Sequence, residues 1–280
     1  MNKEQLDKFK AWFDGFVGRF YSDDEYINAN IKLKQDHSKR VCEETLFLAD
    51  ELSLDENKRL LAETIALLHD VGRFPQFAKY QTYHDPRSVN HCLLAVSVLK
   101  EHRVLDVLEP AERQIILDAI EYHGLKELPA RLKARSRSPR GVAEGLRRKN
   151  LDEDTLLFCR LIRDADKLDI YRVVIQAYTQ QREDPDNFKF EMELPDEPRC
   201  SPGIIQAILN GEHIDYAKLQ TWNDMKLINL AWVYDVNFIP TLKRIKERKA
   251  LETIIDLLPD TPDIRKVRDK VLSYVDSRIK

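Results

Sequence analysis

The chain carries a histidine and an aspartate side by side, His69-Asp70, at the end of the apolar run Leu60–Leu68. Burying an ionised side chain costs several kcal/mol unless a counter-charge or a metal balances it. Neighbouring residues on a helix point about 100° apart, so both side chains can reach one ion from the end of the same turn. The doublet therefore indicates a metal site if the rest of the chain supplies more ligands.

Further imidazoles and carboxylates lie at the ends or on the apolar faces of expected helices. His37 lies on the apolar face of one helix, His91 opens another, and His123 closes the helix after that. Asp166 lies on the apolar stripe of a later helix. Asp169 follows one turn on, where a side chain can orient a metal ligand without binding the metal. The chain thus offers enough ligands for the site.

These residues could bind one ion or two. Imidazoles and carboxylates together suit a divalent transition metal, namely Mn, Fe, Ni, Zn or Co, and the sequence does not choose among them. A single ion would use four residues: His37, His69, Asp70 and Asp166. A second ion would add His91 and His123, with Asp70 as the bridge because its two oxygens can face two ions. Two metals about 3.5–4 Å apart can clamp a phosphoryl group and generate a hydroxide.

Two residues near the doublet are candidates for contacting a substrate. Arg73, three residues after Asp70, could hold a phosphate through two hydrogen bonds, or could be an ordinary surface arginine. His84 lies in an expected loop and could contact the substrate or simply be solvated. His102 lies about 16 Å along the helix from His91 and is left out of the site.

The order of these residues resembles the HD-domain superfamily of metal-dependent phosphohydrolases, whose pattern is a His, a His-Asp doublet and a distant Asp. The segments 67–73 and 164–169 resemble the doublet motif and the closing motif of that superfamily. His91 and His123 match the extra histidines of its binuclear branch. The resemblance covers roughly residues 30–180. The Gly-Tyr-Pro signature of the cyclic-di-GMP phosphodiesterases is absent after His123, which argues against that substrate.

The resemblance implies an all-α fold, a multi-helix HD-domain-like bundle with additional C-terminal helices. It also implies hydrolysis of a nucleotide or related phosphate ester, either a monoester or a diester, by metal-activated water. Asp70 and Arg73 would then be the catalytic residues. One alternative is a nucleotide-sensing module whose metal site is vestigial. A narrower alternative is (p)ppGpp hydrolysis, for which the chain has no companion synthetase segment.

The composition predicts a mostly helical protein, whereas a small anionic phosphate substrate is implied by the resemblance alone. The 280 residues are 43% apolar and 33% charged with only eight glycines, which favours long helices over a large sheet. The net charge of -3 gives no general attraction to nucleic acid or membranes. The four cysteines are scattered, and no signal peptide or membrane span is expected, so we predict a cytoplasmic protein. The oligomeric state is left open.

The expected elements divide the chain into three parts. Residues 1–30 are predicted as an N-terminal helical extension, 31–181 as the metal-binding core, and 182–280 as a helical region packed on that core. Within the core, helices are expected over 35–52, 53–70, 91–102, 110–123 and 153–181, with a loop over 74–90. Ser53 is the expected cap of the second of these. Three more helices are expected after residue 203.

A basic insertion is expected within the core over 126–149. Residues 131–149 contain eight Lys or Arg and a single acid. Such a stretch is most simply a solvated segment, and the alternative is a lid over an anionic substrate. Residues 182–203 are expected to form a short hairpin or a loop.

Overall fold

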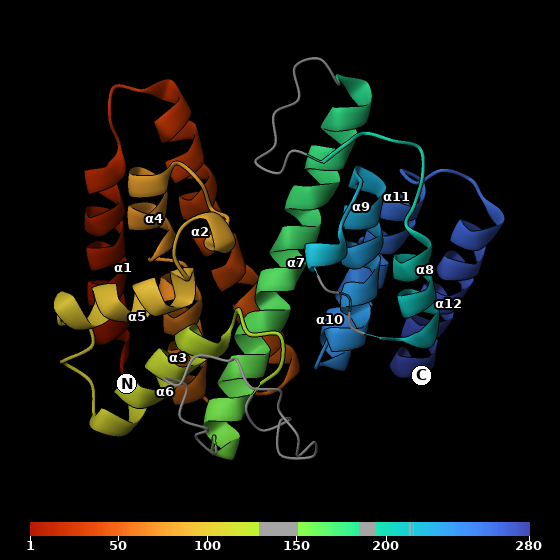
Figure 1. Cartoon of the computed structure of the whole chain (residues 1–280). Helices are drawn as coiled ribbons and strands as arrows, with labels where there is room; N and C mark the ends of the chain where they lie inside the picture. The colour runs from red at the N-terminus through yellow and green to blue at the C-terminus, as the bar shows by residue number, and fades with distance from the viewer. Residues whose placement is uncertain (129–150, 185–193, 213, 215) are drawn as a thin grey trace, which may run out of the picture. The chain divides into compact units, whose positions relative to one another are not determined.

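The computed structural model describes residues 1–128, 151–184, 194–212, 214 and 216–280. These residues form helices and connecting turns without a strand, which confirms the predicted all-α fold (Figure 1). The chain divides into two compact units, Met1–Ala165 and Asp166–Lys280, and each is described by itself. No described helix is long and apolar enough to cross a bilayer. Most of the expected basic insertion 126–149 and residues 185–193 of the expected hairpin or loop 182–203 lie outside the described residues.

The N-terminal helices break at a different place from the one expected. Helix α1 spans Lys3–Val17, a short 3-10 turn η1 follows over Gly18–Phe20, and α2 spans Glu25–Glu51. The prediction of one helix over 1–30 and another from 35 was therefore wrong. The reason is Asp24, whose carboxylate accepts hydrogen bonds from the backbone N–H groups of Tyr26 and Ile27 and so caps α2 about ten residues early.

Helix α3 spans Glu56–Leu68 and ends directly before the doublet. Its cap is Asp55, which accepts a hydrogen bond from the backbone N–H of Lys58, so the prediction of Ser53 as the cap was wrong. Ser53 instead has a left-handed backbone with φ of 52° and makes the turn between α2 and α3.

The segment after the doublet is helical where a loop was predicted. Helix α4 spans Arg73–Tyr80 and accommodates Pro75 in its first turn, where no N–H is needed. A 3-10 turn η2 over Asp85–Arg87 and then α5 over His91–Glu101 follow. The Asn90 side chain caps α5, and α6 spans Pro110–Tyr122. The two expected helices over 91–102 and 110–123 are confirmed.

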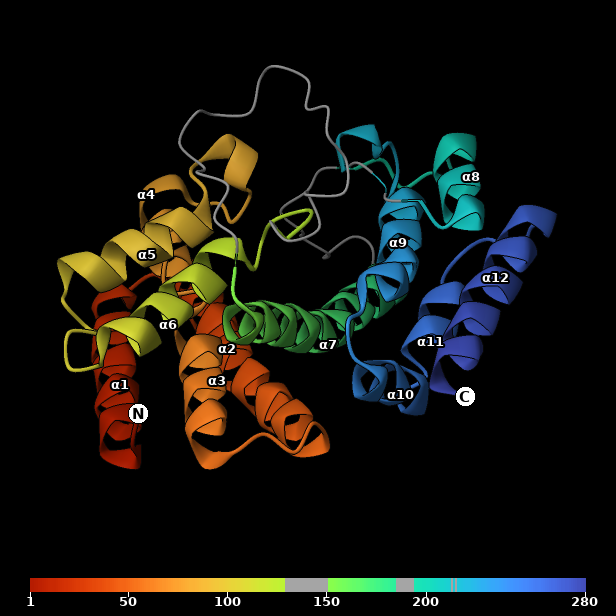
Figure 2. The same cartoon turned by 90° about the horizontal axis from the view of Figure 1, so that it is seen from below.

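Unit 1 is a bundle with α3 at its centre. Helix α3 packs against α1, α2 and α6, while α5 packs against α4 and α6, and Figure 2 shows α5 and α6 side by side. The core is apolar, with Leu48, Ile65 and Ile116 almost fully buried. This packing brings the C-terminal ends of α3 and α6, the first turn of α5 and the middle of α2 together.

Helix α7 spans Glu153–Glu183, close to the predicted 153–181, and the division between the units falls inside it. After α7, the described residues of unit 2 form five α-helices where three were predicted: α8 Pro202–Asn210, α9 Trp222–Ala231, α10 Ile239–Glu247, α11 Ala250–Ile255 and α12 Pro262–Ile279. The 3-10 turns η4 Tyr216–Lys218 and η5 Trp232–Asp235 lie between them. The apolar core of the unit includes Tyr178 of α7 and Trp222 of α9.

Candidate metal centre

A close approach of two backbones brings the doublet next to the start of α5. His69 is the C-terminal cap of α3, and Gly72 lies in the turn that follows Asp70. A Cβ atom added to Gly72 would lie 2.3 Å from the carbonyl oxygen of His91 and 2.6 Å from the backbone nitrogen of Ala95. Only hydrogen fits there, so glycine is needed for the turn to lie against α5. The carboxylate of Asp70 consequently reaches the ring of His91.

Four imidazoles surround the buried carboxylate of Asp70, two facing each oxygen. The Nε2 atoms of His37 and His69 lie 3.6 and 3.7 Å from Oδ2. Those of His91 and His123 lie 3.6 and 3.9 Å from Oδ1. The four rings come from the middle of α2, the end of α3, the start of α5 and the end of α6. This arrangement provides two groups of ligand atoms that share one carboxylate.

Backbone carbonyls orient two of the imidazoles. The Nδ1 atom of His69 lies 2.7 Å from the carbonyl oxygen of Ala66, and that of His123 lies 2.7 Å from the carbonyl oxygen of Ile120. A carbonyl oxygen can only accept, so each Nδ1 carries the proton and donates it. In the neutral ring the basic nitrogen is then Nε2, which is the atom on the side of Asp70. A metal-binding histidine is oriented in this way.

His91 is oriented by a carboxylate that sequence reasoning missed. Its Nδ1 lies 2.7 Å from Oδ2 of Asp85. The other oxygen of Asp85 accepts hydrogen bonds from Arg73 Nη1 and Gln76 Nε2, both at 2.9 Å. Burial raises the pKa of Asp85, but the hydrogen bond and charge of His91, with Arg73 nearby, outweigh it and lower the pKa to about 2. Asp85 is therefore ionised and holds the proton of His91 on Nδ1.

The Asp70 carboxylate is kept ionised by the charges around it. Burial raises its pKa, but Lys34 and the other neighbouring cations, including Arg73, outweigh burial and hold the pKa well below its usual range. The Lys34 Nζ lies 2.9 Å from Oδ2 of Asp70, and its side chain is 19% exposed. Lys34 was missed in the sequence, although its place one turn before His37 on the same helix was a usable signal.

Asp166 is the first residue of unit 2, but α7 continues through the division as one helix. Arg163, one turn earlier and within unit 1, donates hydrogen bonds to the carbonyl oxygens of His123 and Leu125. This turn is therefore attached to the end of α6. A carboxylate oxygen of Asp166 and ligand nitrogens of His69 and His123 lie within 4.8 Å of one another.

The guanidinium of Arg73 is hydrogen-bonded to the loop before α5 and does not extend into solvent. Its Nη1 donates to Gln76, to the carbonyl of Tyr83 and to Asp85, and its Nε lies 3.5 Å from Oδ1 of Asp70. Its side chain is 15% exposed, so it is not an ordinary surface arginine. The geometry gives it a positioning role that the sequence did not suggest.

Three residues considered in the sequence remain, namely His84, Asp169 and His102. His84 is half-buried in the loop before Asp85 and belongs to none of the ligand groups found among the described residues. Asp169 is buried one turn beyond Asp166 on α7 and is likewise in none of these groups. The ring of His102 packs edge-on against Phe16 and at a tilt against Trp12, in keeping with its exclusion from the site.

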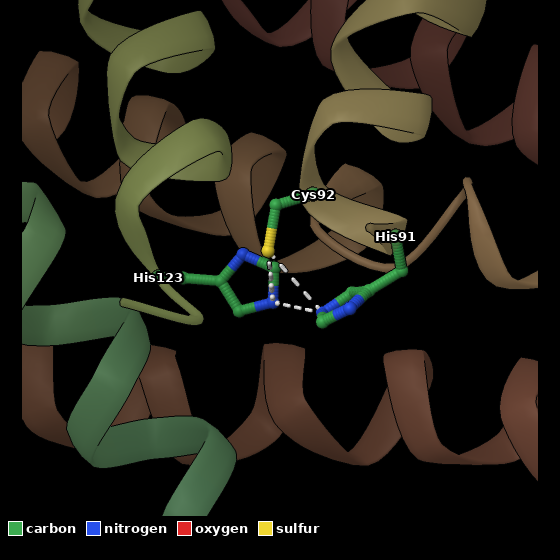
Figure 3. A group of neighbouring side chains, drawn as sticks. All are labelled: His91, Cys92 and His123. Atoms are coloured by element: carbon green, nitrogen blue, oxygen red, sulfur yellow. Dashed lines mark hydrogen bonds between the residues drawn. The ribbon is translucent and has the colours of Figure 1, made fainter. Parts of the chain in front are cut away.

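Cys92 joins the pair His91 and His123 and was also missed. Its sulfur lies 3.3 Å from Nε2 of His91 and 3.9 Å from Nε2 of His123 (Figure 3). In a sequence, cysteines indicate a metal site mainly as closely spaced pairs, and the four cysteines of this chain form no such pair. Burial and the nearby charge of Asp70 raise the pKa of the thiol to about 12, so it is protonated unless a cation binds.

The ligand set fits a divalent transition metal. Two atoms each about 2.1 Å from one ion lie about 3.0–3.9 Å apart for angles of about 90–140° at the metal. The distances of 3.6–3.9 Å between the imidazoles and Asp70 lie in or close to this range and exceed those of ordinary hydrogen bonds. In His69, His91 and His123, the Nδ1 atom also lies within hydrogen-bonding distance of an oxygen acceptor. These observations suit metal ligation on the Nε2 side.

Comparison with known proteins gives one match. Residues 35–171 match the family model described as the HD domain. The matched range contains all the predicted metal ligands, from His37 to Asp166. No curated protein and no solved structure matches the chain.

Proposed function

This chain belongs to the HD-domain family through residues 35–171, and from that membership we propose that it is a metal-dependent phosphohydrolase acting on a nucleotide or a related phosphate ester. Members of this family bind divalent metals, and most are hydrolases. The observation that carries the proposal is the carboxylate of Asp70, which presents one oxygen to His37 and His69 and the other to His91 and His123. Asp70 would bridge two ions.

The proposed ligands are His37, His69, Asp70, His91, His123 and Asp166. A divalent metal held by them supplies a Lewis acid and lowers the pKa of a water molecule toward neutrality. The chain contributes the orientation: Ala66 and Ile120 hold the imidazoles of His69 and His123, and Asp85 holds that of His91. The ligands are therefore in place before a substrate arrives.

Lys34 and Arg73 are the proposed partners of the substrate phosphate. Both side chains lie beside the carboxylate of Asp70, and both are partly exposed. A positive charge fixed at this point stabilises the negative charge that grows on the phosphoryl oxygens during hydrolysis. Lys34 is the better candidate, because Nη1 of Arg73 is already bound to the loop that contains Asp85.

The test is an assay of metal-loaded protein with a panel of nucleotides and an aryl phosphate. We expect Asp70→Asn to lower kcat by at least about 100-fold, because a metal contributes several kcal/mol to such reactions. His102→Asn is the matched control, since His102 lies outside the centre against Trp12 and Phe16. Equal activity of Asp70→Asn and the unaltered protein would refute the proposal.

Metal content separates this proposal from a nucleotide-sensing module with a vestigial site. A hydrolase should retain at least about one transition metal per chain after purification without chelators, because several ligands hold it. A sensor with a vestigial site should retain much less than that. No observation favours (p)ppGpp over other phosphate esters as the substrate.

A further inference from the structure

The thiol of Cys92 lies beside the two imidazoles proposed for the second metal position. Its sulfur is close to Nε2 of both His91 and His123, and those two nitrogens are 3.2 Å apart. All three residues are buried, with 2%, 8% and 6% of their surfaces exposed. We propose that Cys92 is a ligand of the second metal ion, which makes that position a nitrogen-sulfur site; this inference rests on the proposed function.

The distances between the three atoms suit one tetrahedral ion. Zinc bonds of about 2.05 Å to nitrogen and 2.3 Å to sulfur place two nitrogens about 3.3 Å apart and a nitrogen and a sulfur about 3.6 Å apart. The structure has 3.2 Å between the nitrogens of His91 and His123, and 3.3 and 3.9 Å from these nitrogens to the sulfur of Cys92. Oδ1 of Asp70 is close enough to be the fourth ligand.

Gly124 keeps this place open for the sulfur. A Cβ atom added to Gly124 would lie 2.8 Å from Sγ of Cys92 and 3.4 Å from Cε1 of His91, so a larger residue would push the sulfur away. The thiolate is the form of cysteine that binds a metal. On binding, the sulfur gains a bond to the metal and its proton passes to solvent.

The two positions would differ in their preference for metals. The first offers His37, His69 and Oδ2 of Asp70, which are nitrogen and oxygen ligands that accept manganese or iron as well as zinc. The second adds the soft sulfur of Cys92, and thiolates favour zinc over manganese. When both metals are supplied, zinc should therefore enter the second position first. Loss of the sulfur should weaken zinc binding there and leave the first position unchanged.

X-ray absorption on the full-length, zinc-loaded protein tests the proposal directly. With two zinc ions per chain we expect a sulfur shell at about 2.3 Å with an occupancy of about 0.5 per zinc. Cys92→Ser should remove this shell and lower the affinity for the second zinc ion by at least about tenfold. Cys42→Ser is the matched control, because Cys42 is also buried but contacts the carbonyl oxygen of Glu63 instead. The control should keep the sulfur shell.

The possible results separate this inference from the proposed function. Two bound zinc ions without a sulfur shell, or a shell that persists in Cys92→Ser, would overturn the role of Cys92 and leave the hydrolase proposal standing. A sulfur shell in a metal-loaded protein that hydrolyses no phosphate ester would support Cys92 and count against the hydrolase. Protein that binds no zinc would overturn the role of Cys92 and leave the hydrolase proposal to be decided by the assay with manganese, iron, nickel or cobalt. If Cys92→Ser does not fold, the unaltered protein provides the test. A sulfur shell in its spectrum would support the role of Cys92, and the absence of that shell would overturn it.

Discussion

Replacing Gly72 by alanine should lower the stability of unit 1 and disturb the proposed second metal position. The added Cβ would lie 2.3 Å from the carbonyl oxygen of His91, about 1.1 Å short of the 3.4 Å at which ordinary contact begins. Both atoms that crowd it most belong to the backbone, so no side-chain rotation can relieve the clash. Helix α5 and the turn after Asp70 must therefore move apart.

The expected cost follows from that displacement. Overpacking of a close contact lowers the free energy of unfolding by about 1–3 kcal/mol, which corresponds to a Tm lower by about 2–12 °C. A shift of about 1 Å also exceeds the tolerance of about 0.5 Å that a metal site allows. We expect Gly72→Ala to weaken the binding of the second metal, which uses His91, more than that of the first.

Thermal unfolding and zinc titration provide the measurements, and Gly15→Ala provides the control. Gly15 lies in α1 with no atom near its missing Cβ, so alanine there should stabilise the helix by about 0.5–1 kcal/mol. If Gly72→Ala kept both the Tm and the affinity for the second metal, then the contact between the turn and α5 would not position the site.

Three further predictions concern other residues. In a zinc titration, Asp85→Asn should lower the affinity for the second metal by about 10–100-fold, because it removes the carboxylate that orients His91. Unchanged affinity would contradict this. Arg163→Met should lower the free energy of unfolding by about 2–4 kcal/mol in urea, because two carbonyls at the end of α6 lose a charged donor. Burial raises the pKa of Cys159 to about 12, so stability should fall as the pH rises above about 9, where the unfolded thiol ionises and the folded one does not. Cys159→Ala should reduce that slope by up to about 1.4 kcal/mol per pH unit, and an equal slope would show that burial does not hold the thiol protonated.

The residues that meet at Asp70 could be predicted from the sequence because each is a histidine or aspartate at the end or on the apolar face of a helix. Periodicity and caps located α5 and α6 well, and Asn90 and Pro110 are strong local signals. The bridge role of Asp70 was predicted on chemical grounds and stays a prediction, while the structure shows two imidazoles on the side of each of its oxygens.

The residues that were missed depend on contacts distant in sequence. Asp85 lies in a polar loop, and only the fold brings it to His91. Lys34 looks like one more charged residue on a long helix until its contact with Asp70 is known. Cys92 has no cysteine neighbour, so a search for cysteine pairs could not find it. Local sequence also misplaced the start of α2, because the cap at Asp24 outweighed the polar character of the stretch around it.

The position of Asp166 on α7 has a consequence for the order in which the site is made. The four histidines and Asp70 are all synthesised before residue 124, whereas Asp166 follows about 40 residues later. At about 5–20 residues per second, the ribosome adds this last carboxylate about 2–8 s after the final imidazole. The nascent chain therefore contains five of the six proposed ligands for several seconds before the last one is added.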